Sequence, residues 1–279
     1  MNRIVTYIRQ SLKDIYPPEE VRAMIQIICC DMLSVRAIDL YTDKDINLSV
    51  SKELELKNIV IRLQKNEPIQ YVRGVADFCG MTFKVCPGVL IPRPETAELV
   101  YLIIKEQTTA RRLLDIGTGS GCIAVSLAKQ MKGTSVTAWD ISSRALEVAR
   151  QNNVMCGTDV CFEKQDVFAK IENDDSLKYD VIVSNPPYVR NSEKQEMNLN
   201  VLDWEPESAL FVSDDDPLLF YRRIAILGLT LLKPDGFLYF EINRAFGQEV
   251  VSLLKKHHYQ QVRLLKDFYG NDRIVSAKR

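Results

Sequence analysis

Residues 181–188 read Val-Ile-Val-Ser-Asn-Pro-Pro-Tyr and combine a buried strand with a rigid turn. The first three residues are apolar and β-branched, which favours a central strand of a parallel sheet. The two prolines donate no backbone hydrogen bond and restrict the residue before each of them, so the chain is expected to leave the strand in a stiff, extended conformation. The side chain of Asn185 is therefore predicted to be held at the carboxyl end of a strand, where open α/β sheets bind their ligands. Tyr188 ends the turn with a flat face that can pack on a planar group.

From residue 111 onward, short apolar runs alternate with helical patterns. Such alternation predicts an α/β fold with a mostly parallel sheet and helices between the strands. The expected strands are 112–116, 135–140, 159–168 with its exit, 179–184 and 237–242. The expected helices are 122–129, 142–152, 217–232 and 248–258, with a turn at 233–236. Two final runs, 262–266 and 273–277, predict an antiparallel hairpin at the end of the sheet.

The part of the chain before this pattern is expected to form smaller units. Residues 1–73 show a helical spacing of apolar residues, beginning with Ile4 and Ile8, and predict a small helical bundle. This part holds no cluster of titratable residues, so recognition or support is expected there and not chemistry. Residues 74–92 predict a β-hairpin and a proline-rich connector, and residues 93–279 form the expected α/β domain.

The composition argues against several classes of protein. The 279 residues carry a net charge of −1, so a protein held mainly by nucleic-acid phosphates is not expected. No run approaches the roughly 18 apolar residues of a membrane span, and the N-terminus lacks a signal-peptide pattern. The seven cysteines form no Cys-x-x-Cys motif, and the only histidines are adjacent, at 257–258. We therefore expect a cytoplasmic protein with reduced cysteines, no metal site and no membrane contact, and we expect a monomer.

A glycine-rich turn follows the expected strand 112–116 and reads Asp115-x-Gly117-x-Gly119-x-Gly121. Glycines in such a turn let the backbone approach a ligand closely, and an acid at the end of the next strand, here Asp140, can bind a ribose. The dinucleotide fingerprint would need a glycine where Cys122 stands, and a P-loop would need a lysine directly after the last glycine of the turn. Neither of these two motifs is complete.

The spacing of this turn and of Asp140 resembles the S-adenosylmethionine site of class I methyltransferases, which have a Rossmann-like fold. The resemblance implies S-adenosyl-L-methionine as cofactor and S-adenosyl-L-homocysteine as product. Asp140 would accept hydrogen bonds from both ribose hydroxyls, Asp166 and Phe168 would hold the adenine, and Asn185 would border the cofactor. The residues implied to pass under the methionine part are Gly117, Thr118, Gly119, Ser120 and Gly121.

Residues 185–188 resemble the Asn/Asp-Pro-Pro-Tyr motif of methyltransferases that act on a planar amino or amide nitrogen. Methyl transfer from a sulfonium mainly requires alignment of the reacting atoms. The side-chain oxygen of Asn185 and the main-chain oxygen of Pro186 would accept the two N–H groups of an amide and stabilise the positive charge that grows on its nitrogen. Pro187 and Tyr188 would complete the substrate site. No strong base is needed before transfer, which agrees with the absence of histidine and lysine from the motif.

The resemblance extends over nearly the whole chain. The helical N-terminal part, the hairpin, the run Val89-Leu90-Ile91-Pro92-Arg93-Pro94-Glu95-Thr96, the glycine-rich turn and residues 185–189 together resemble the bacterial release factor glutamine methyltransferases, the PrmC/HemK family. That family methylates N5 of the glutamine in the Gly-Gly-Gln motif of class-1 peptide chain release factors, which implies these factors as partners. Arg93, fixed between two prolines, is expected to form a wall of the substrate site. The chain departs from the family pattern at Ala97 and at residues 212–216.

Three other interpretations remain open. The related enzyme that methylates a glutamine of a large-subunit ribosomal protein shares the tetrapeptide. An amino methyltransferase acting on a nucleic-acid base would flip the base onto Tyr188, but the near-neutral charge disfavours it. A binding module that kept the cofactor fold would bind S-adenosylmethionine without turnover, and the intact Asn185 and Asp140 disfavour this interpretation.

Overall fold

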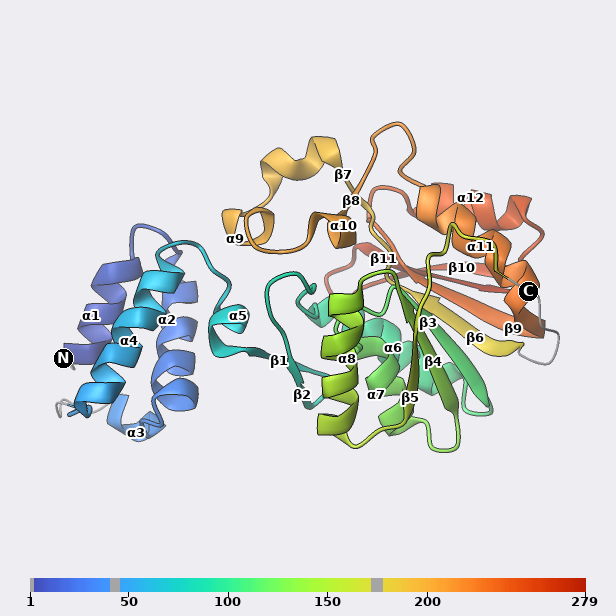
Figure 1. Ribbon diagram of the computed structural model, residues 1–279. Helices are drawn as coiled ribbons and strands as arrows, with labels where there is room; N and C mark the ends of the chain where they lie inside the picture. Colours follow the sequence, from blue (N-terminus) through green and yellow to red (C-terminus); the bar gives the residue numbers. More distant parts are fainter. Residues whose placement is uncertain (1–2, 41–45, 172–177) are drawn as a thin grey trace. The chain divides into compact units, whose positions relative to one another are not determined.

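The computed structural model describes residues 3–40, 46–171 and 178–279, and Figure 1 shows its helices and strands. The contacts divide the chain into two compact units, one of residues 1–74 with 198–204 and the other of residues 75–197 with 205–279. No helix of the described residues is both long and apolar enough to cross a membrane.

The first unit contains α1 (Arg3–Leu12), α2 (Pro18–Gln26) with a π-helical extension η1 (Ile27–Met32), α3 (Ala37–Leu40), α4 (Val50–Leu63) and α5 (Ile69–Arg73). Ser49 begins α4, since its side chain accepts a hydrogen bond from the backbone N–H of Lys52. The core contains the apolar residues whose spacing predicts the helices, including Ile8, and Tyr16 donates its hydroxyl proton to the carbonyl of Leu63 at 2.7 Å. Hydrophobic contact between the helices therefore holds this unit together.

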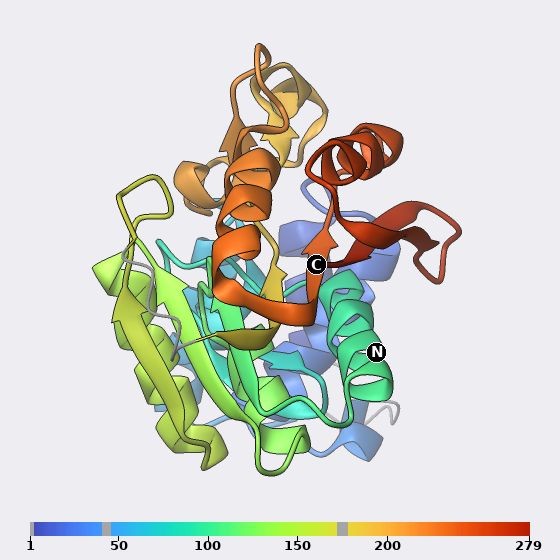
Figure 2. The same cartoon turned by 90° about the vertical axis from the view of Figure 1, so that its right-hand side faces the viewer.

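The second unit contains a seven-stranded sheet in the order β10-β11-β9-β6-β3-β4-β5. Its strands are β3 (Arg112–Ile116), β4 (Ser135–Asp140), β5 (Val160–Lys164), β6 (Tyr179–Ser184), β9 (Leu232–Glu241), β10 (Gln260–Lys266) and β11 (Asp272–Lys278). Five neighbouring strands of this sheet run parallel, namely β9, β6, β3, β4 and β5. The strand β11 is antiparallel to both of its neighbours, β9 and β10. The C-terminal hairpin, red in Figure 2, thus forms one edge of the sheet. This arrangement confirms the predicted mostly parallel sheet with an antiparallel hairpin.

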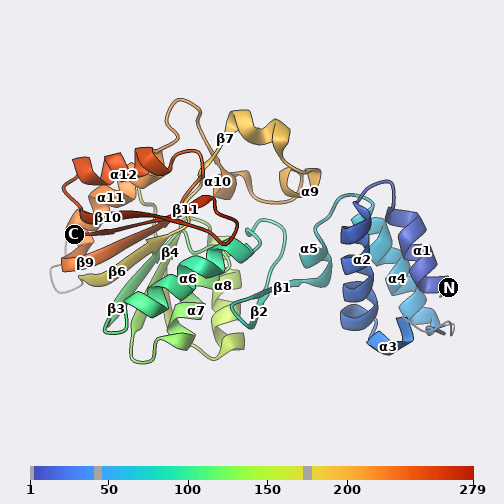
Figure 3. The ribbon, with the colours of Figure 1, turned by 180° about the vertical axis from the view of Figure 1, so that it is seen from behind.

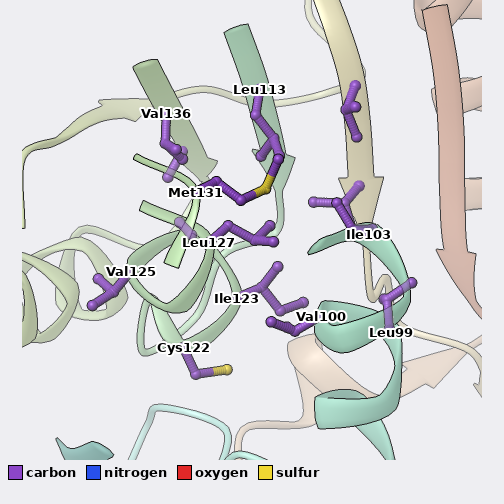
Figure 4. Close-up of a cluster of buried hydrophobic side chains, with 14 of the residues drawn as sticks. Leu99, Val100, Ile103, Leu113, Cys122, Ile123, Val125, Leu127, Met131 and Val136 are labelled. Carbon is purple, nitrogen blue, oxygen red and sulfur yellow. The ribbon is translucent and has the colours of Figure 1, made fainter. Parts of the chain in front are cut away.

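Helices cover both faces of this sheet. The helices α11 (Leu219–Leu231) and α12 (Gly247–Lys256) pack on one face, and α6 (Pro94–Glu106) and α7 (Cys122–Gln130) pack on the other, where they lie side by side (Figure 3). The helix α8 (Ser143–Cys156) follows β4. Neighbouring residues of β3 face opposite cores, because Leu113 packs with α6 and α7 (Figure 4) whereas Leu114 packs with α11.

Several short elements complete the chain. The hairpin of β1 (Val75–Phe78) and β2 (Met81–Lys84) turns at Cys79 and Gly80, both at positive φ. After β6 the chain forms β7 (Val189–Arg190), the 3-10 helix η3 (Asn191–Glu196), α9 (Leu199–Leu202), α10 (Glu207–Leu210) and β8 (Phe211–Val212). The strands β7 and β8 pair with each other, and their two-residue length is too short for a pattern that sequence reasoning could detect.

The expected turn at 233–236 is wrong in one respect, because these residues belong to β9. The pairing of β9 with β6 stops at Leu232, which faces Tyr179, and resumes at Phe237, which faces Val181. The four residues between these two pairs form a bulge without a partner on β6, and Asp235 within it takes a positive φ of 66°. The turn residues of the sequence therefore produce a bulge inside a strand and not a break between two elements.

Candidate active site

A cavity of about 340 Å³ lies at the carboxyl ends of the parallel strands of the second unit. It is the location that open α/β sheets use for ligands. Of the predicted site residues, it is lined by Gly117, Gly119, Asp140, Asp166, Phe168, Asn185, Pro186 and Pro187. These residues follow four different strands, so the fold brings together groups that are up to 70 positions apart in the sequence.

The three glycines of the turn after β3 have different surroundings. Gly117 and Gly119 have positive φ angles of 76° and 56°, and a Cβ added to either would have no other atom within 4 Å. The backbone there faces open space, where a ligand can approach it. Gly121 also has a positive φ, but a Cβ added to it would lie 3.0 Å from Cβ of Ala149 on α8. Gly121 thus permits close packing of the turn against α8, whereas the other two glycines leave room for a ligand.

Two other predicted residues of this turn, Thr118 and Ser120, are buried. The Thr118 hydroxyl donates to Oδ2 of Asp115 at 2.6 Å, and Oδ1 of Asp115 has no hydrogen-bond partner among the described residues. Burial raises the pKa of Asp115 to about 7. These side chains therefore stabilise the turn from inside the protein.

Asp140 ends β4 and closes the glycine-rich turn. Its Oδ2 accepts the N–H of Gly119 and its Oδ1 accepts the N–H of Ser142, both at 2.8 Å. A carboxylate oxygen can accept two hydrogen bonds, so each oxygen keeps one acceptor position, and Asp140 lines the cavity. Burial raises the pKa of Asp140, and the backbone N–H groups oppose this rise. A carboxylate with two remaining acceptor positions suits two adjacent hydroxyl groups, as on a ribose.

Asp166 and Phe168 lie in the exit from β5. Oδ1 of Asp166 accepts the N–H of Phe168 at 2.8 Å, which fixes the backbone between them. The Phe168 ring is 44% exposed and contacts Phe220 of α11 edge to face, with 5.3 Å between ring centroids. Phe220 and Ile141 also line the cavity, and apolar side chains of this kind suit contact with a planar base. Sequence reasoning missed these two residues, although Ile141 directly follows the predicted acid.

Asn185 contacts a group of polar side chains outside the cavity. Its Nδ2 donates to Oγ1 of Thr96 at 3.3 Å, and the Thr96 hydroxyl donates to Oε2 of Glu241 at 2.6 Å. The hydroxyl of Tyr188 donates to the other carboxylate oxygen, Oε1, at 3.1 Å. Tyr188 thus packs toward Glu241 and is not among the lining residues of the described cavity, although Pro186 and Pro187 are. Sequence reasoning missed Glu241, which is the last residue of β9.

Arg93 is used in an ion pair inside the second unit. Its guanidinium donates to Oε1 of Glu205 at 2.6 Å, and Oε2 of Glu205 accepts the N–H of Ile91 at 3.2 Å. The Glu205 side chain is buried, so this pair joins the proline-rich connector to the segment before α10. Arg93 does not line the described cavity, whereas Val89 and Leu90 of the same connector do.

The fold and the site define a methyltransferase of class I, and comparisons with known proteins agree. The Methyltransferase small domain family matches residues 95–203, and the PrmC N-terminal domain family matches residues 3–74. A solved methyltransferase from Pyrococcus furiosus has a similar fold, with a TM-score of 0.54 at 19% identity over 80% of this chain and 98% of the other.

Similar sequences identify the particular family. The release factor glutamine methyltransferase of Bacteroides thetaiotaomicron is 62% identical over the full length of both chains. The enzyme of the same name from Flavobacterium psychrophilum is 43% identical over 96% of this chain and 95% of its own. The chain belongs to the release factor glutamine methyltransferase family. The predicted fold class and the predicted cofactor, S-adenosylmethionine, are confirmed with this assignment.

Proposed function

We propose that this protein transfers a methyl group from S-adenosylmethionine to N5 of the glutamine in the Gly-Gly-Gln motif of class-1 peptide chain release factors. The observation that carries the proposal is the position of Asn185 in a rigid Asn-Pro-Pro turn at the cavity wall. Its carboxamide nitrogen is bound to Thr96, and no described residue donates a hydrogen bond to its oxygen. That oxygen is therefore available to accept an N–H group of a substrate amide.

The cavity residues fit the cofactor as well. Asp140 would bind the ribose hydroxyls with its two remaining acceptor positions. The open backbone at Gly117 and Gly119 would lie along the methionine part, and Phe168 with Phe220 would contact the adenine. When bound, S-adenosylmethionine supplies an electrophilic methyl group on a sulfonium.

The protein's contribution to the transfer is alignment and electrostatic stabilisation. The oxygens of Asn185 and Pro186 would orient the two N–H groups of the glutamine amide, whose lone pair is otherwise delocalised into its carbonyl. They would also stabilise the positive charge that develops on the nitrogen. No general base among the cavity residues is required before the transfer, and the nitrogen, which carries one proton too many once it is methylated, then releases that proton to water.

The remaining parts have proposed roles too. The N-terminal helical domain, residues 1–73, would recognise the substrate protein, the hairpin and connector 74–92 would join it to the methyltransferase domain 93–279, and Arg93 would support the substrate wall through Glu205. The protein would act as a cytoplasmic monomer without direct contact to nucleic acid. Seven free cysteines are compatible with a reducing compartment.

A methyl-transfer assay tests this function. Labelled S-adenosylmethionine is offered with a class-1 release factor, its Gly-Gly-Gln→Gly-Gly-Ala variant, ribosomal protein or DNA, and the labelled peptides are identified by mass. We expect one methyl group on the loop glutamine of the release factor and none on its variant. Methylation of ribosomal protein or DNA in place of the release factor would show that the proposed substrate is wrong.

A further inference from the structure

Behind Asn185 lies a buried chain of polar side chains from separate elements. Thr96 stands in the first turn of α6 and is 2% exposed, and Glu241 ends β9 and is 1% exposed. The chain runs from Nδ2 of Asn185 to Oγ1 of Thr96 at 3.3 Å, and from there to Oε2 of Glu241 at 2.6 Å. Neither Thr96 nor Glu241 lines the described cavity. Burying a carboxylate at this depth has a substantial desolvation cost, so Glu241 is expected to have a role other than packing.

The types of these three side chains determine which group donates and which accepts in each hydrogen bond. An ionised carboxylate only accepts hydrogen bonds, so the single proton of the Thr96 hydroxyl must point to Glu241. The oxygen of that hydroxyl can then only accept from Asn185. The carboxamide of Asn185 must present its NH₂ group to Thr96, and its Oδ1 is directed away from Thr96. With Glu241 ionised, the donor count therefore fixes the orientation of the Asn185 carboxamide.

Other groups hold the carboxylate of Glu241 in place. The hydroxyl of Tyr188 donates to Oε1 at 3.1 Å, so both carboxylate oxygens accept hydroxyl protons. Burial raises the pKa of Glu241, while the Thr96 hydrogen bond and the positive charge of Arg273 on β11 oppose this rise. Arg273 is itself fixed by Asp267, with 3.2 Å between Nε and Oδ2. Two hydroxyl donors and a cation thus offset part of the cost of burying the ionised form of Glu241, on which the direction depends.

We propose that Thr96 and Glu241 are positioning residues that hold the Asn185 carboxamide with its oxygen directed to the methyl-accepting amide. This inference rests on the proposed function, because it gives Asn185 the role of amide acceptor. The fixed carboxamide would also favour a substrate that offers N–H groups at this position. An Asn185 that rotated by half a turn would present two donors to an amide N–H, which would repel the substrate.

A double-mutant cycle separates this role from a merely structural one. Turnover is measured with the release factor for the wild type, Thr96→Val, Asn185→Ala and the double variant. Valine keeps the shape of threonine and removes the hydroxyl. We expect Thr96→Val to lower kcat by roughly two- to tenfold, the effect of one hydrogen bond, in the wild type. In the Asn185→Ala background it should change kcat by less than about 1.5-fold, since its action passes through Asn185.

Matched variants complete the experiment. Thr96→Ser keeps the hydroxyl and should restore wild-type kcat. Thr134→Val removes a hydroxyl that donates to the carbonyl of Ala110 at 2.8 Å, away from the cavity, and should leave kcat unchanged. Glu241→Gln replaces a carboxylate that only accepts hydrogen bonds by an amide that can also donate, so the direction of the hydrogen bonds is no longer fixed and kcat should fall only where Asn185 is present. Because Glu241→Gln changes no side-chain volume, it carries the test if Thr96→Val does not fold.

The outcomes distinguish this inference from the proposed function. Equal losses of kcat from Thr96→Val in both backgrounds, or full activity of Thr96→Val and Glu241→Gln, would overturn the positioning role and leave the substrate assignment intact. A wild-type protein that does not methylate the release factor would instead overturn the proposed function. Affinity for S-adenosylhomocysteine, measured by calorimetry, should remain within about twofold in all Thr96 variants, because Thr96 does not line the cavity.

Discussion

Replacing Asp140 by alanine tests the cofactor site most directly. The carboxylate of Asp140 has two functions in the structure. It accepts the backbone N–H groups of Gly119 and Ser142, each at 2.8 Å, and it lines the cavity. Asp140→Ala therefore removes the expected ribose contact and also releases the glycine-rich turn.

The size of the effect can be worked from these contacts. A hydrogen bond to a charged group contributes about 1.5–3 kcal/mol, and water entering the space left by the side chain recovers part of two such bonds. The free Gly119 N–H adds a further loss, since the turn must be ordered again when the ligand binds. We expect binding to weaken by about 2–4 kcal/mol, which is roughly a 30- to 900-fold higher Kd.

The assay is isothermal titration calorimetry with S-adenosylhomocysteine, which binds without reacting. Glu147→Ala serves as the control, because Glu147 is an exposed acid on α8 that does not line the cavity. Its Kd should match that of the wild type. A Kd for Asp140→Ala within twofold of the wild-type value would refute the role of Asp140, and an equal loss in Glu147→Ala would show that the effect is a general one of charge.

Three other substitutions test the catalytic turn, the packing of the glycines and a buried acid. Asn185→Ala should lower kcat by roughly 10²–10³ while the Kd for S-adenosylhomocysteine stays within about tenfold, because one preorganised polar group is lost; unchanged turnover would contradict this. Gly121→Ala should lower the unfolding free energy by about 2–4 kcal/mol, from its positive φ and the 3.0 Å approach to Ala149, whereas Gly270→Ala should show only the smaller strain because its Cβ would have no neighbour within 4 Å; urea unfolding that gives equal losses would refute the packing argument. Since burial raises the pKa of Asp115 to about 7, native Asp115 retains its proton more strongly than unfolded Asp115, and its ionisation costs about 4 kcal/mol of stability. The unfolding free energy of the wild type relative to Asp115→Asn should therefore be highest below about pH 4 and fall as the pH rises to about 7; a difference that does not vary with pH would contradict the assigned ionisation.

Much of the fold could be predicted because its determinants are local. Strands such as β6 are short apolar runs between turn residues, and the alternation with helices requires crossover connections and therefore a parallel sheet. The glycine-rich turn and the Asn-Pro-Pro turn were recognisable for the same reason, since backbone sterics of glycine and proline act on the residue itself and its neighbours. The bulge at Asp235 was not predictable, because it depends on the register with β6.

For the candidate site too, some features follow from the sequence alone and others only from the tertiary structure. The amino-acid sequence by itself determined which residues stand at the carboxyl ends of strands, with Asp140 as the last residue of β4 and Asn185 directly after β6. It also determined the family, since the motifs extend over the whole chain. What those residues contact is a property of the tertiary structure.

Only the tertiary structure shows which side chains form hydrogen bonds with the predicted site residues. Thr96 and Glu241 are 145 positions apart, and Arg93 and Glu205 are 112 positions apart. Hydrogen bonds of this kind depend on where a helix and a strand meet in space, and no local pattern encodes that meeting. The sequence therefore sufficed to place Asn185 at the end of a strand, whereas the packing of α6 against β9 brought Thr96 and Glu241 together behind it.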